Sequence, residues 1–588
     1  MIEDLWYKNA VIYHLDVESF VDSNGDGVGD FEGLVRRLDY IETLGVDVLW
    51  IAPFYATPNR DNGYDVSDYY AVDPRLGTLG ELVELVHQAK KRGLKVIMDL
   101  VVNHSSDEHP WFQRSRAGDP KYADWYVWSK KRPPNWDKGM VFPGVQRSTW
   151  TRDAERGEYY FHRFYEFEPD LNIDNPAVRT EIRRIMGFWL QLGVDGFRID
   201  AVPFLIEHPS PGDPSKPTKM HFDYLEELRE FSHWRSGPTV LLGEANVLPD
   251  ESREYFRDGR GIQMMFNFWV NQHLFYALAT GEVAELREAL TATRELPHSA
   301  QWAQFLRNHD ELDLGRLSDE QRATVFERFA PDPSMQLYGR GIRRRLAPML
   351  GNRPHQELAY SMCFALPGTP VLRYGDEIGM GDHLELKERI AVRTPMQWSG
   401  EPQAGFSTAE DLVHPVIDFG VYDYHHVNVE NQRRDPDSML RWTIRLIRVR
   451  KECPEIGWGR WEILETGSPH VLAMRYDWRG TSVVTLHNFD DHPHDVSLRV
   501  GVPNGDDLFD LWAPRDSHAG DEGVHDIAIE AYGYRWYRVG DLNYALRRRA
   551  EEPTLEQEKK ETAPKRERAE KTRARSEVRK STRTRKKR

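Results

Sequence analysis

VDVLWIAPF (46–54) and LKVIMDLVVNH (94–104) are short apolar runs, and each follows an amphipathic stretch that ends in glycine. The stretch before the first run, FEGLVRRLDYIETLG (31–45), carries its apolar residues in one helical stripe, with Asp30 as a predicted N-cap. Another apolar run, AVIYHLDV (10–17), precedes that helix. Buried strands that alternate with helices ending in glycine are typical of a parallel sheet covered by helices.

The same alternation continues through most of the chain. Five further apolar runs predict strands: VDGFRIDAV (194–202), TVLLGEAN (239–246), IQMMFNFWV (262–270), WAQFLRNHD (302–310) and TPVLRYGDEIG (369–379). Together with the first three runs they make eight buried strands separated by helices. This count favours an α/β fold of the (β/α)8 type, a TIM barrel, over an open doubly wound sheet.

Three segments depart from this alternation. Residues 105–180, between the third and fourth strands, are too long for an ordinary connection and predict an inserted subdomain over the barrel mouth. Residues 457–540 contain alternating strand patterns, which predict a C-terminal antiparallel β domain, a β-sandwich. Residues 541–588 are predicted to be a disordered basic tail. The barrel itself is therefore assigned to residues 1–104 and 181–456.

Composition narrows the class of protein. A chain of 588 residues that is 40% hydrophobic is large enough for two or three folded units. Its start lacks the pattern of a secretory signal, and no window of about 18 apolar residues is present, so we expect a cytoplasmic protein with no membrane partner. Two cysteines, Cys363 and Cys453, fit a reducing compartment. Without a P-loop or a G-x-G-x-x-G after a strand, no organic cofactor is implied.

The net charge of −16 is unevenly distributed. Residues 547–588 carry 18 Lys and Arg against 8 Glu, so the rest of the chain carries −26. This acidic body argues against nucleic acid as the main ligand. The sequence leaves open a partner for the basic tail and whether the chain forms a homo-oligomer.

Three carboxylates stand at the predicted carboxyl ends of strands, where barrels of this type build their sites: Asp200, Glu244 and Asp310. Each one alone is better explained as a helix cap or turn residue. Together they offer the nucleophile and the acid that retaining glycoside cleavage needs, about 5 Å apart. Arg198 points to the same side of its strand as Asp200 and would keep it ionised, whereas apolar surroundings would raise the pKa of Glu244.

A second candidate site lies in DSNGDGVGDF (22–31). Oxygen-bearing side chains recur with the spacing of a calcium-binding loop at Asp22, Asn24, Asp26 and Asp30. The twelfth position of this loop is Gly33, where an EF-hand has a bidentate Glu, so an EF-hand sensor is excluded. A structural calcium loop and a polar turn without metal both remain open at this point.

Four motifs, in order, resemble the signature regions of the alpha-amylase family, glycoside hydrolase family 13: DLVVNH (99–104), GFRIDAV (196–202), GEAN (243–246) and FLRNHDE (305–311). The resemblance covers roughly residues 5–540. It implies that Asp200 is the nucleophile, that Glu244 is the acid/base, and that Asp310 binds and distorts the sugar ring. It also implies a set of substrate-binding residues: Asp61, Tyr64, His104, Arg198, His309 and Arg393. Tyr64 would stack on the sugar, and Asp61 with Arg393 would close the non-reducing side, which implies small substrates.

Finer details resemble the branch of this family that contains oligo-1,6-glucosidases and trehalose synthases. EPDLN (168–172) is similar to the QPDLN region of that branch, with Glu168 in place of Gln, and Val202 is a further match. The branch binds calcium in a loop of this form, which implies a structural Ca²⁺ held by the side chains named above and by the carbonyl oxygen of Val28.

Within the branch, RNHDELDLGRL, GRGIRRRLAPML (339–350) and VRTPMQWS resemble the trehalose synthases, which interconvert maltose and trehalose. Arg373 and the start YHLDVESF depart from that pattern. The resemblance implies a retaining α-glucosyl transfer through a glucosyl-enzyme on Asp200, with a small α-glucoside as the substrate. One alternative is an α-glucosidase or oligo-1,6-glucosidase, in which water reaches the intermediate. Another is a non-catalytic carbohydrate-binding or assembly protein, which would be expected to lack Asp200 or Glu244.

Overall fold

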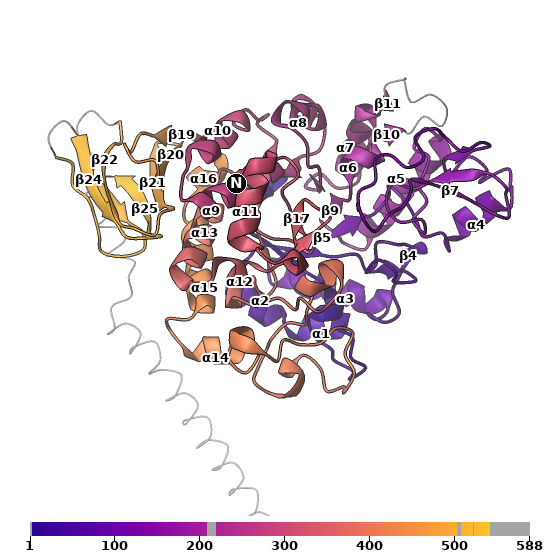
Figure 1. Cartoon of the computed structure of the whole chain (residues 1–588), viewed down its shortest axis with the longest axis horizontal. Coiled ribbons are helices and arrows are strands. Elements are labelled where there is room, and N and C mark those ends of the chain that lie inside the picture. Colours follow the sequence, from indigo (N-terminus) through magenta and orange to yellow (C-terminus); the bar gives the residue numbers. More distant parts are fainter. Residues whose placement is uncertain (1–2, 209–218, 502–506, 521–522, 541–588) are drawn as a thin grey trace, which may run out of the picture.

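The computed structural model describes residues 3–208, 219–501, 507–520 and 523–540. The predicted tail lies outside these residues. Figure 1 shows the C-terminal strands β22 (His494–Arg499) and β24 (Val524–Ile529) at one end of the molecule and the inserted helix α4 (Pro110–Arg116) at the other. The barrel lies between them. In the described part of the chain, no helix is long and apolar enough to span a membrane.

Eight parallel strands close into a barrel, and the predicted fold class is confirmed. The strands are β1 (Ile12–Leu15), β2 (Val48–Ile51), β5 (Lys95–Leu100), β9 (Gly196–Ile199), β12 (Val240–Gly243), β13 (Met264–Phe266), β14 (Gln301–Phe305) and β18 (Thr369–Arg373). They pair in sequence order, and β1 pairs with β18 to close the ring. Each predicted run contains its strand, but each observed strand is shorter than its run, because the residues that follow the strand belong to the loops that carry the site.

Strand alternation divides the apolar residues between two cores. Val48 and Trp50 of β2 belong to the cluster inside the barrel, whereas Leu49 and Ile51 belong to the larger cluster between strands and helices. The short 3-10 helix η1 (Glu3–Asn9) adds Tyr7 to the inner cluster. The barrel is therefore filled by side chains, and any ligand has to bind at its mouth.

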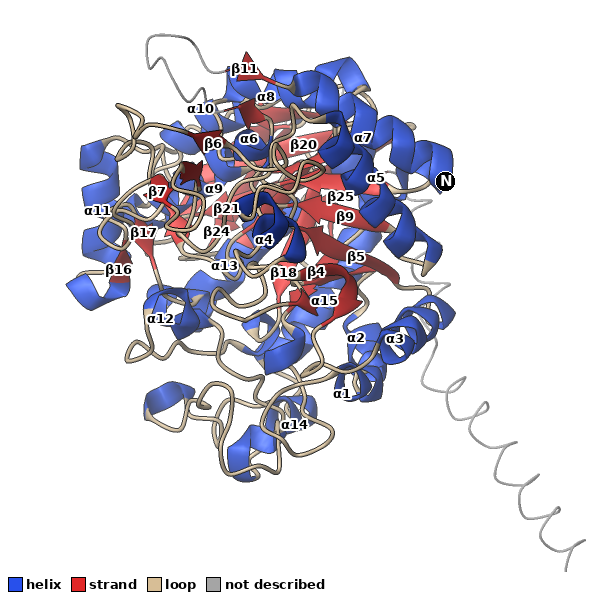
Figure 2. Cartoon of the chain, turned by 90° about the vertical axis from the view of Figure 1, so that its right-hand side faces the viewer, coloured by secondary structure: helices blue, strands red, loops and turns tan. Residues whose placement is uncertain are grey.

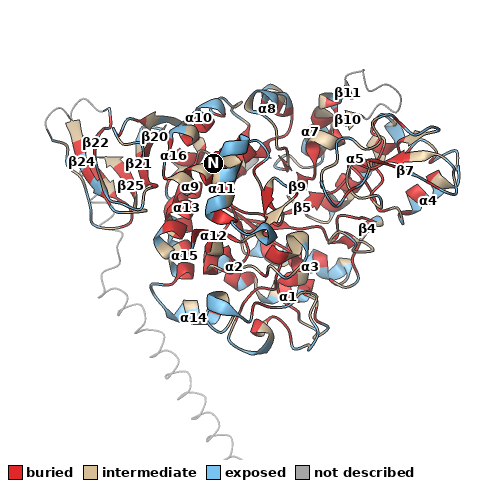
Figure 3. Cartoon of the chain, in the orientation of Figure 1, coloured by how far each residue is buried: buried red, intermediate tan, exposed pale blue. Residues whose placement is uncertain are grey.

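Helices surround the barrel, as the end-on view in Figure 2 shows. They include α1 (Phe31–Arg36), α2 (Leu38–Leu44), α3 (Leu79–Lys91), α5 (Pro176–Gln191), α7 (Phe222–Arg235), α8 (Pro249–Phe256), α9 (Phe268–Thr280), α10 (Ala284–Ala292), α11 (Asp319–Phe329), α13 (Arg353–Ala365) and α15 (Met439–Lys451). Their outer faces are exposed and the strands beneath them are buried (Figure 3). The amphipathic stripes read from the sequence are these buried faces.

Two local predictions need correction. The stretch 31–45 forms two helices, α1 and α2, which are separated at Arg37; the Arg37 guanidinium lies over the Trp398 ring, 4.2 Å from its centroid. Asp30 does cap α1, since its side chain accepts the N–H of Gly33. The run 262–270 is a strand only to Phe266, after which α9 begins.

The insertion after β5 contains α4 and a small antiparallel sheet of β6 (Trp128–Ser129), β8 (Tyr159–Phe161) and β7 (Trp150–Arg152). The predicted boundary at 180/181 falls within α5. The loop after β14 forms a second small sheet of β15 (Leu312–Asp313), β17 (Gly341–Ile342) and β16 (Gln336–Leu337). Both small sheets stand on the carboxyl side of the barrel strands, where they frame its mouth.

The C-terminal region is antiparallel, as predicted. Five strands form one sheet: β19 (Arg460–Leu464), β20 (Val471–Trp478), β21 (Thr481–Asn488), β25 (Tyr534–Gly540) and β23 (Asp507–Asp510). Strands β22 and β24 form a separate pair. Apolar side chains from both sheets, among them Val484 and Val496, share one buried cluster.

Candidate active site

The carboxyl ends of three barrel strands bring the three predicted catalytic carboxylates to one cavity. Asp200 follows β9 directly and Glu244 follows β12 directly, and these strands are neighbours, with Arg198 opposite Leu242. Asp310 lies in the loop after β14. All three carboxylates line a cavity of about 390 Å³, which is near the small end of the range of ~300–1,000 Å³ for ligand pockets.

One buried arginine organises the floor of this cavity. Arg198 Nη1 lies 2.7 Å from Asp200 Oδ1, and its Nη2 lies 2.7 Å from Glu244 Oε2. Nη1 also forms an ion pair with Asp99, whose other oxygen accepts the indole N–H of Trp50 at 2.8 Å. Two carboxylates that share one guanidinium are held side by side. Asp99 thus orients Arg198 from behind.

The pKa values of the two floor carboxyls are raised to different extents. Burial raises the pKa of Glu244 to about 7, although Arg198 opposes the shift. This confirms the direction predicted from its apolar strand. Burial also raises the pKa of Asp200 to about 6, so the lowering by Arg198 is real but is the smaller effect. Between these two values Asp200 is largely ionised while Glu244 is largely protonated, which is the division that a nucleophile and an acid require.

Tyr64 lines the cavity, and two buried histidine rings lie behind it. The rings of Tyr64 and His309 are nearly parallel, with 5.5 Å between centroids, and Tyr64 Oη lies 2.7 Å from His309 Nε2. His309 Nδ1 lies 3.1 Å from His14 Nε2. Burial lowers the pKa of His309 to about 4, so the ring is neutral. His14 was not predicted from the sequence, where a histidine inside the apolar run 10–17 was the available signal.

Asp310 differs from the floor carboxyls. Its Oδ2 lies 3.0 Å from His309 Nε2. Burial raises its pKa, but His309 and two nearby arginines outweigh that effect and hold the pKa well below its usual range. An ionised carboxylate can only accept hydrogen bonds. Asp310 is therefore suited to bind sugar hydroxyl groups and not to supply a proton.

Arg389 closes the side of the cavity where Asp61 lies. Its Nη2 lies 2.8 Å from Asp61 Oδ1, and its Nη1 lies 2.9 Å from Asp310 Oδ1. The prediction that Arg393 closes this side with Asp61 is wrong. Arg393 is buried behind the wall, where its Nη2 contacts Asp310 Oδ1 at 3.1 Å and its Nε donates to a backbone carbonyl. The 3-10 segment η6 (Glu388–Val392) turns the first arginine toward the cavity and the second away from it.

Segments far apart in the sequence meet over the cavity mouth. Phe142 of the insertion stacks on Tyr165 at 4.8 Å and packs against Tyr338 at 5.0 Å between centroids. The hydroxyl groups of both tyrosines donate to Glu388 Oε2, at 3.0 and 2.8 Å. Arg340 Nη1 donates to a backbone carbonyl of the insertion at 3.0 Å. These five residues, called the rim below, were not found from the sequence, where the only signal was the aromatic composition of residues 105–180.

His104 and Glu168 complete the lining. His104 Nε2 lies 3.2 Å from the carbonyl oxygen of Tyr64 and 3.9 Å from Glu168 Oε1. Glu168 is fully buried; its Oε2 accepts a backbone N–H, whereas its Oε1 has no hydrogen-bond partner among the described residues. Burial, together with the charge of Asp61, raises the pKa of Glu168 well above its usual range. Glu168 therefore holds its proton to a higher pH than an exposed glutamate does.

The predicted metal loop carries suitable oxygen atoms, but they serve the backbone in this structure. Asp22 Oδ1 accepts the N–H groups of Asn24 and Gly25, and Asn24 Oδ1 accepts that of Asp26. Asp26 Oδ1 accepts the N–H of Val28 at 2.9 Å. In the described part of the chain, the acidic and histidine groups gathered closely enough to hold a metal lie elsewhere. The loop fits Ca²⁺ by the type of its donors, since carboxylate oxygens keep further lone pairs.

The chain matches two family models. One, described as the alpha amylase catalytic domain, matches residues 14–329 and 343–459. The chain belongs to the alpha-amylase family. The other model, described as the sucrose hydrolase-like C-terminal domain, matches residues 480–538. The catalytic match covers all three carboxylates of the cavity, so the resemblance read from the four motifs is confirmed.

Curated relatives of this alpha-amylase family member include trehalose synthases. It is 40% identical to one from Pimelobacter sp., over 92% of this chain and 96% of the relative. It is 41% identical to one from Thermus thermophilus over 93% of this chain, but it spans only 56% of that longer relative. It is 32% identical to an oligo-1,6-glucosidase from Bacillus cereus, over 83% of this chain and 91% of the relative.

A crystal structure of trehalulose synthase from Pseudomonas mesoacidophila superimposes on this chain with a TM-score of 0.73. The sequences are 26% identical, and the superposition covers 91% of this chain and 99% of that chain. The similarity therefore extends beyond the barrel to the insertion and the C-terminal region.

Proposed function

We propose that this chain is a retaining α-glucosyltransferase that interconverts maltose and trehalose. The observation that carries the proposal is the combination of a nucleophile and acid pair with a small cavity whose mouth is bordered by the rim. Similarity to trehalose synthases over nearly the whole chain supports the same substrates. The floor supplies bond cleavage, and the rim decides what reacts with the intermediate.

In the first step Asp200 attacks the anomeric carbon of the non-reducing glucose of maltose. Glu244 donates its proton to the glycosidic oxygen, the bond between that oxygen and the anomeric carbon breaks, and a β-glucosyl ester forms on Asp200. Asp310 and Arg389 hold hydroxyl groups of the transferred glucose, and Tyr64 offers its ring face to the sugar.

In the second step the released glucose stays in the cavity and turns. Its anomeric hydroxyl group attacks the anomeric carbon of the glucosyl ester, the bond from that carbon to the Asp200 oxygen breaks, Glu244 takes the hydroxyl proton, and Asp200 leaves as a carboxylate. The product is trehalose, and the same steps in reverse regenerate maltose. The same intermediate gives two glucose molecules if water attacks first, so exclusion of water by the rim selects transfer over hydrolysis.

The proposal is tested by NMR of the products formed from maltose by the full chain. Trehalose that accumulates well above free glucose supports the transferase. Glucose as the sole product would replace it by the α-glucosidase, in which the rim opens to water. No turnover of maltose, trehalose or isomaltose would mean that the motifs identify the scaffold and its chemistry but that the substrate is another one.

We also propose that loop 22–31 binds Ca²⁺ as a structural ion. The support is its four oxygen-bearing side chains and the buried position of Asp22 and Asp30, which connect the loop to the first barrel helix. Calcium bound there would stiffen the first loop of the barrel. The test is the calcium content of the purified chain and of its Asp26→Ala variant, with the melting temperature measured before and after chelation. An equal calcium content in both chains would contradict the assignment.

A further inference from the structure

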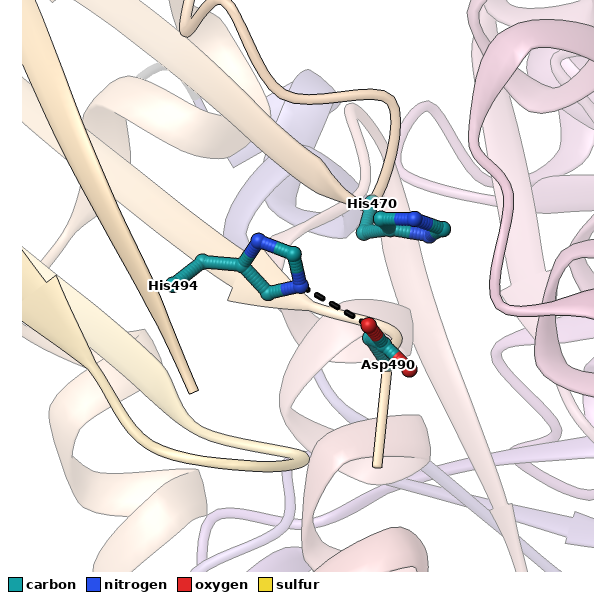
Figure 4. Close-up of side chains that lie close together, drawn as sticks. All are labelled: His470, Asp490 and His494. Carbon is teal, nitrogen blue, oxygen red and sulfur yellow. Dashed lines mark hydrogen bonds and ion pairs between the residues drawn. The ribbon is translucent and has the colours of Figure 1, made fainter. Parts of the chain in front are cut away.

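Three side chains of the C-terminal domain converge outside the active site. His470 lies directly before β20, Asp490 lies two residues after β21, and His494 is the first residue of β22. Figure 4 shows the His494 ring directed at Asp490, with the His470 ring beside both. His494 Nε2 lies 2.8 Å from Asp490 Oδ2, and the two imidazole centroids are 5.1 Å apart. Two imidazoles and one carboxylate, which come from beside three different strands, thus lie close together.

The geometry suits a transition-metal ion. One ligand atom from each residue lies within 4.8 Å of the others. Ligands of a tetrahedral zinc ion, with bonds of about 2.0–2.2 Å, lie about 3.3–3.6 Å from one another, so small side-chain rotations would complete the site. Two nitrogen donors and one oxygen donor favour Zn²⁺ and its neighbours over Mg²⁺ or Ca²⁺. Both Asp490 and His494 keep 23% of their side-chain surface exposed, which leaves an entry path.

The neighbouring groups leave the ligand atoms in the right protonation state. His470 Nδ1 lies 2.8 Å from the carbonyl oxygen of Gly281, which can only accept, so Nδ1 carries the proton and Nε2 is available to a metal. An aspartate side chain is ionised at neutral pH, so Asp490 can offer a carboxylate oxygen. When His494 binds through Nε2, its proton moves to Nδ1, which lies 3.5 Å from Ser468 Oγ.

The position of the cluster gives it a structural purpose. Gly281 caps the barrel helix α9, and Val283 just beyond it donates its N–H to the carbonyl oxygen of Pro469 at 3.0 Å. Strand β22 belongs to a different sheet from β20 and β21. An ion bound here therefore connects both sheets of the C-terminal domain beside their contact with the barrel.

We propose that His470, Asp490 and His494 form a binding site for Zn²⁺ that holds the two sheets of the C-terminal domain together beside the barrel, with water as the fourth ligand. The site is independent of the glucosyl-transfer chemistry. Removal of the metal should lower the melting temperature and leave maltose turnover unchanged at temperatures where the chain is folded.

The experiment uses the full chain purified without a histidine tag and stripped of metal. Calorimetry with Zn²⁺ is expected to give one site per chain that weakens at least tenfold in His470→Ala and in His494→Gln. His492→Ala is the matched control, because His492 is exposed and touches the same carboxylate, and it should bind like the unmodified chain. A rise in melting temperature with Zn²⁺ should be seen in the unmodified chain and in this control alone.

Equal Zn²⁺ affinity in all four chains would overturn the proposal, since the ion would then bind elsewhere. Circular dichroism of each metal-free variant shows whether it folds. If a variant fails to fold, Co²⁺ bound to the unmodified chain gives an independent answer, because tetrahedral and octahedral Co²⁺ differ strongly in visible absorption. An octahedral spectrum would contradict the tetrahedral site.

Discussion

The floor and the rim of the cavity are built in different ways. Arg198, Asp200 and Glu244 stand on or directly after neighbouring barrel strands, and their contacts follow from strand register. Phe142 and Tyr338 of the rim come from an insertion and from a loop almost 200 residues later, and they meet only in the folded chain. The barrel strands thus position the groups that break the bond, whereas segments outside the barrel strands border the mouth through which water would enter.

The largest effect is expected at the floor. Asp200→Asn removes the nucleophile with little change in shape, so maltose turnover should fall by about 10⁴-fold or more. The exposed Asp250→Asn on α8 is the matched control and should keep full activity. Residual turnover within tenfold of the unmodified chain would mean that another group attacks the sugar. The measurement is the initial rate of trehalose formation.

Glu244→Gln should lower turnover of maltose by about 10²–10⁴-fold, because the leaving glucose can no longer be protonated. A substrate whose leaving group needs no proton, α-glucosyl fluoride, should lose far less. In the unmodified chain, kcat/KM should rise as Asp200 ionises near pH 6 and fall as Glu244 loses its proton near pH 7. The same fall in kcat/KM, if Glu244→Gln still shows it with α-glucosyl fluoride, would belong to a group other than Glu244.

Arg389→Lys tests whether one residue between the floor and the rim affects both kcat/KM and the share of hydrolysis. A hydrogen bond to a charged group contributes about 1.5–3 kcal/mol, so loss of the paired contacts to Asp61 and Asp310 should lower kcat/KM by about 10–100-fold. The share of free glucose among the products should increase, because Arg389 lines the cavity. Arg393→Lys also weakens a contact to Asp310, but from behind the wall, and should leave the glucose share unchanged. If both variants gave the same share of free glucose among their products, Arg389 would have no part in excluding water.

The smallest effect is expected at Glu168. Because its raised pKa keeps Glu168 protonated to a higher pH than an exposed glutamate, Glu168→Gln should change turnover by no more than about threefold at pH values where Glu168 carries its proton. When the pH rises far enough for Glu168 to ionise, the unmodified chain gains a charge beside Asp61, whereas the variant does not. The variant should therefore keep substrate affinity to higher pH, measured as KM across the pH range. The control is Glu166→Gln, because Glu166 is exposed. If Glu168→Gln gave the same dependence of KM on pH as the unmodified chain, this account would be contradicted.

The same division explains what could be predicted from the sequence. Buried parallel strands are continuous apolar runs, so all eight were found, and a polar residue that ends such a run, such as Asp200, could be placed at the barrel mouth. Arg389 could not be chosen over Arg393, because one lies inside a short 3-10 segment and the other caps it, and contacts with distant residues set the direction of both side chains. The rim has no local signal, since neither Phe142 nor Tyr338 shows its partner in its own neighbourhood.

The pairing of β1 with β18 has a consequence for how the chain is made. Ile12 lies beside Val371, so one edge of the first strand stays without its partner until the eighth strand has left the ribosome. At about 5–20 residues per second this takes roughly 20–70 s. During that time the apolar edge of β1 is open to pairing with other chains. Expression at high levels should therefore be limited by aggregation of nascent chains, and slower synthesis or a chaperone that covers the first strands should raise the soluble yield.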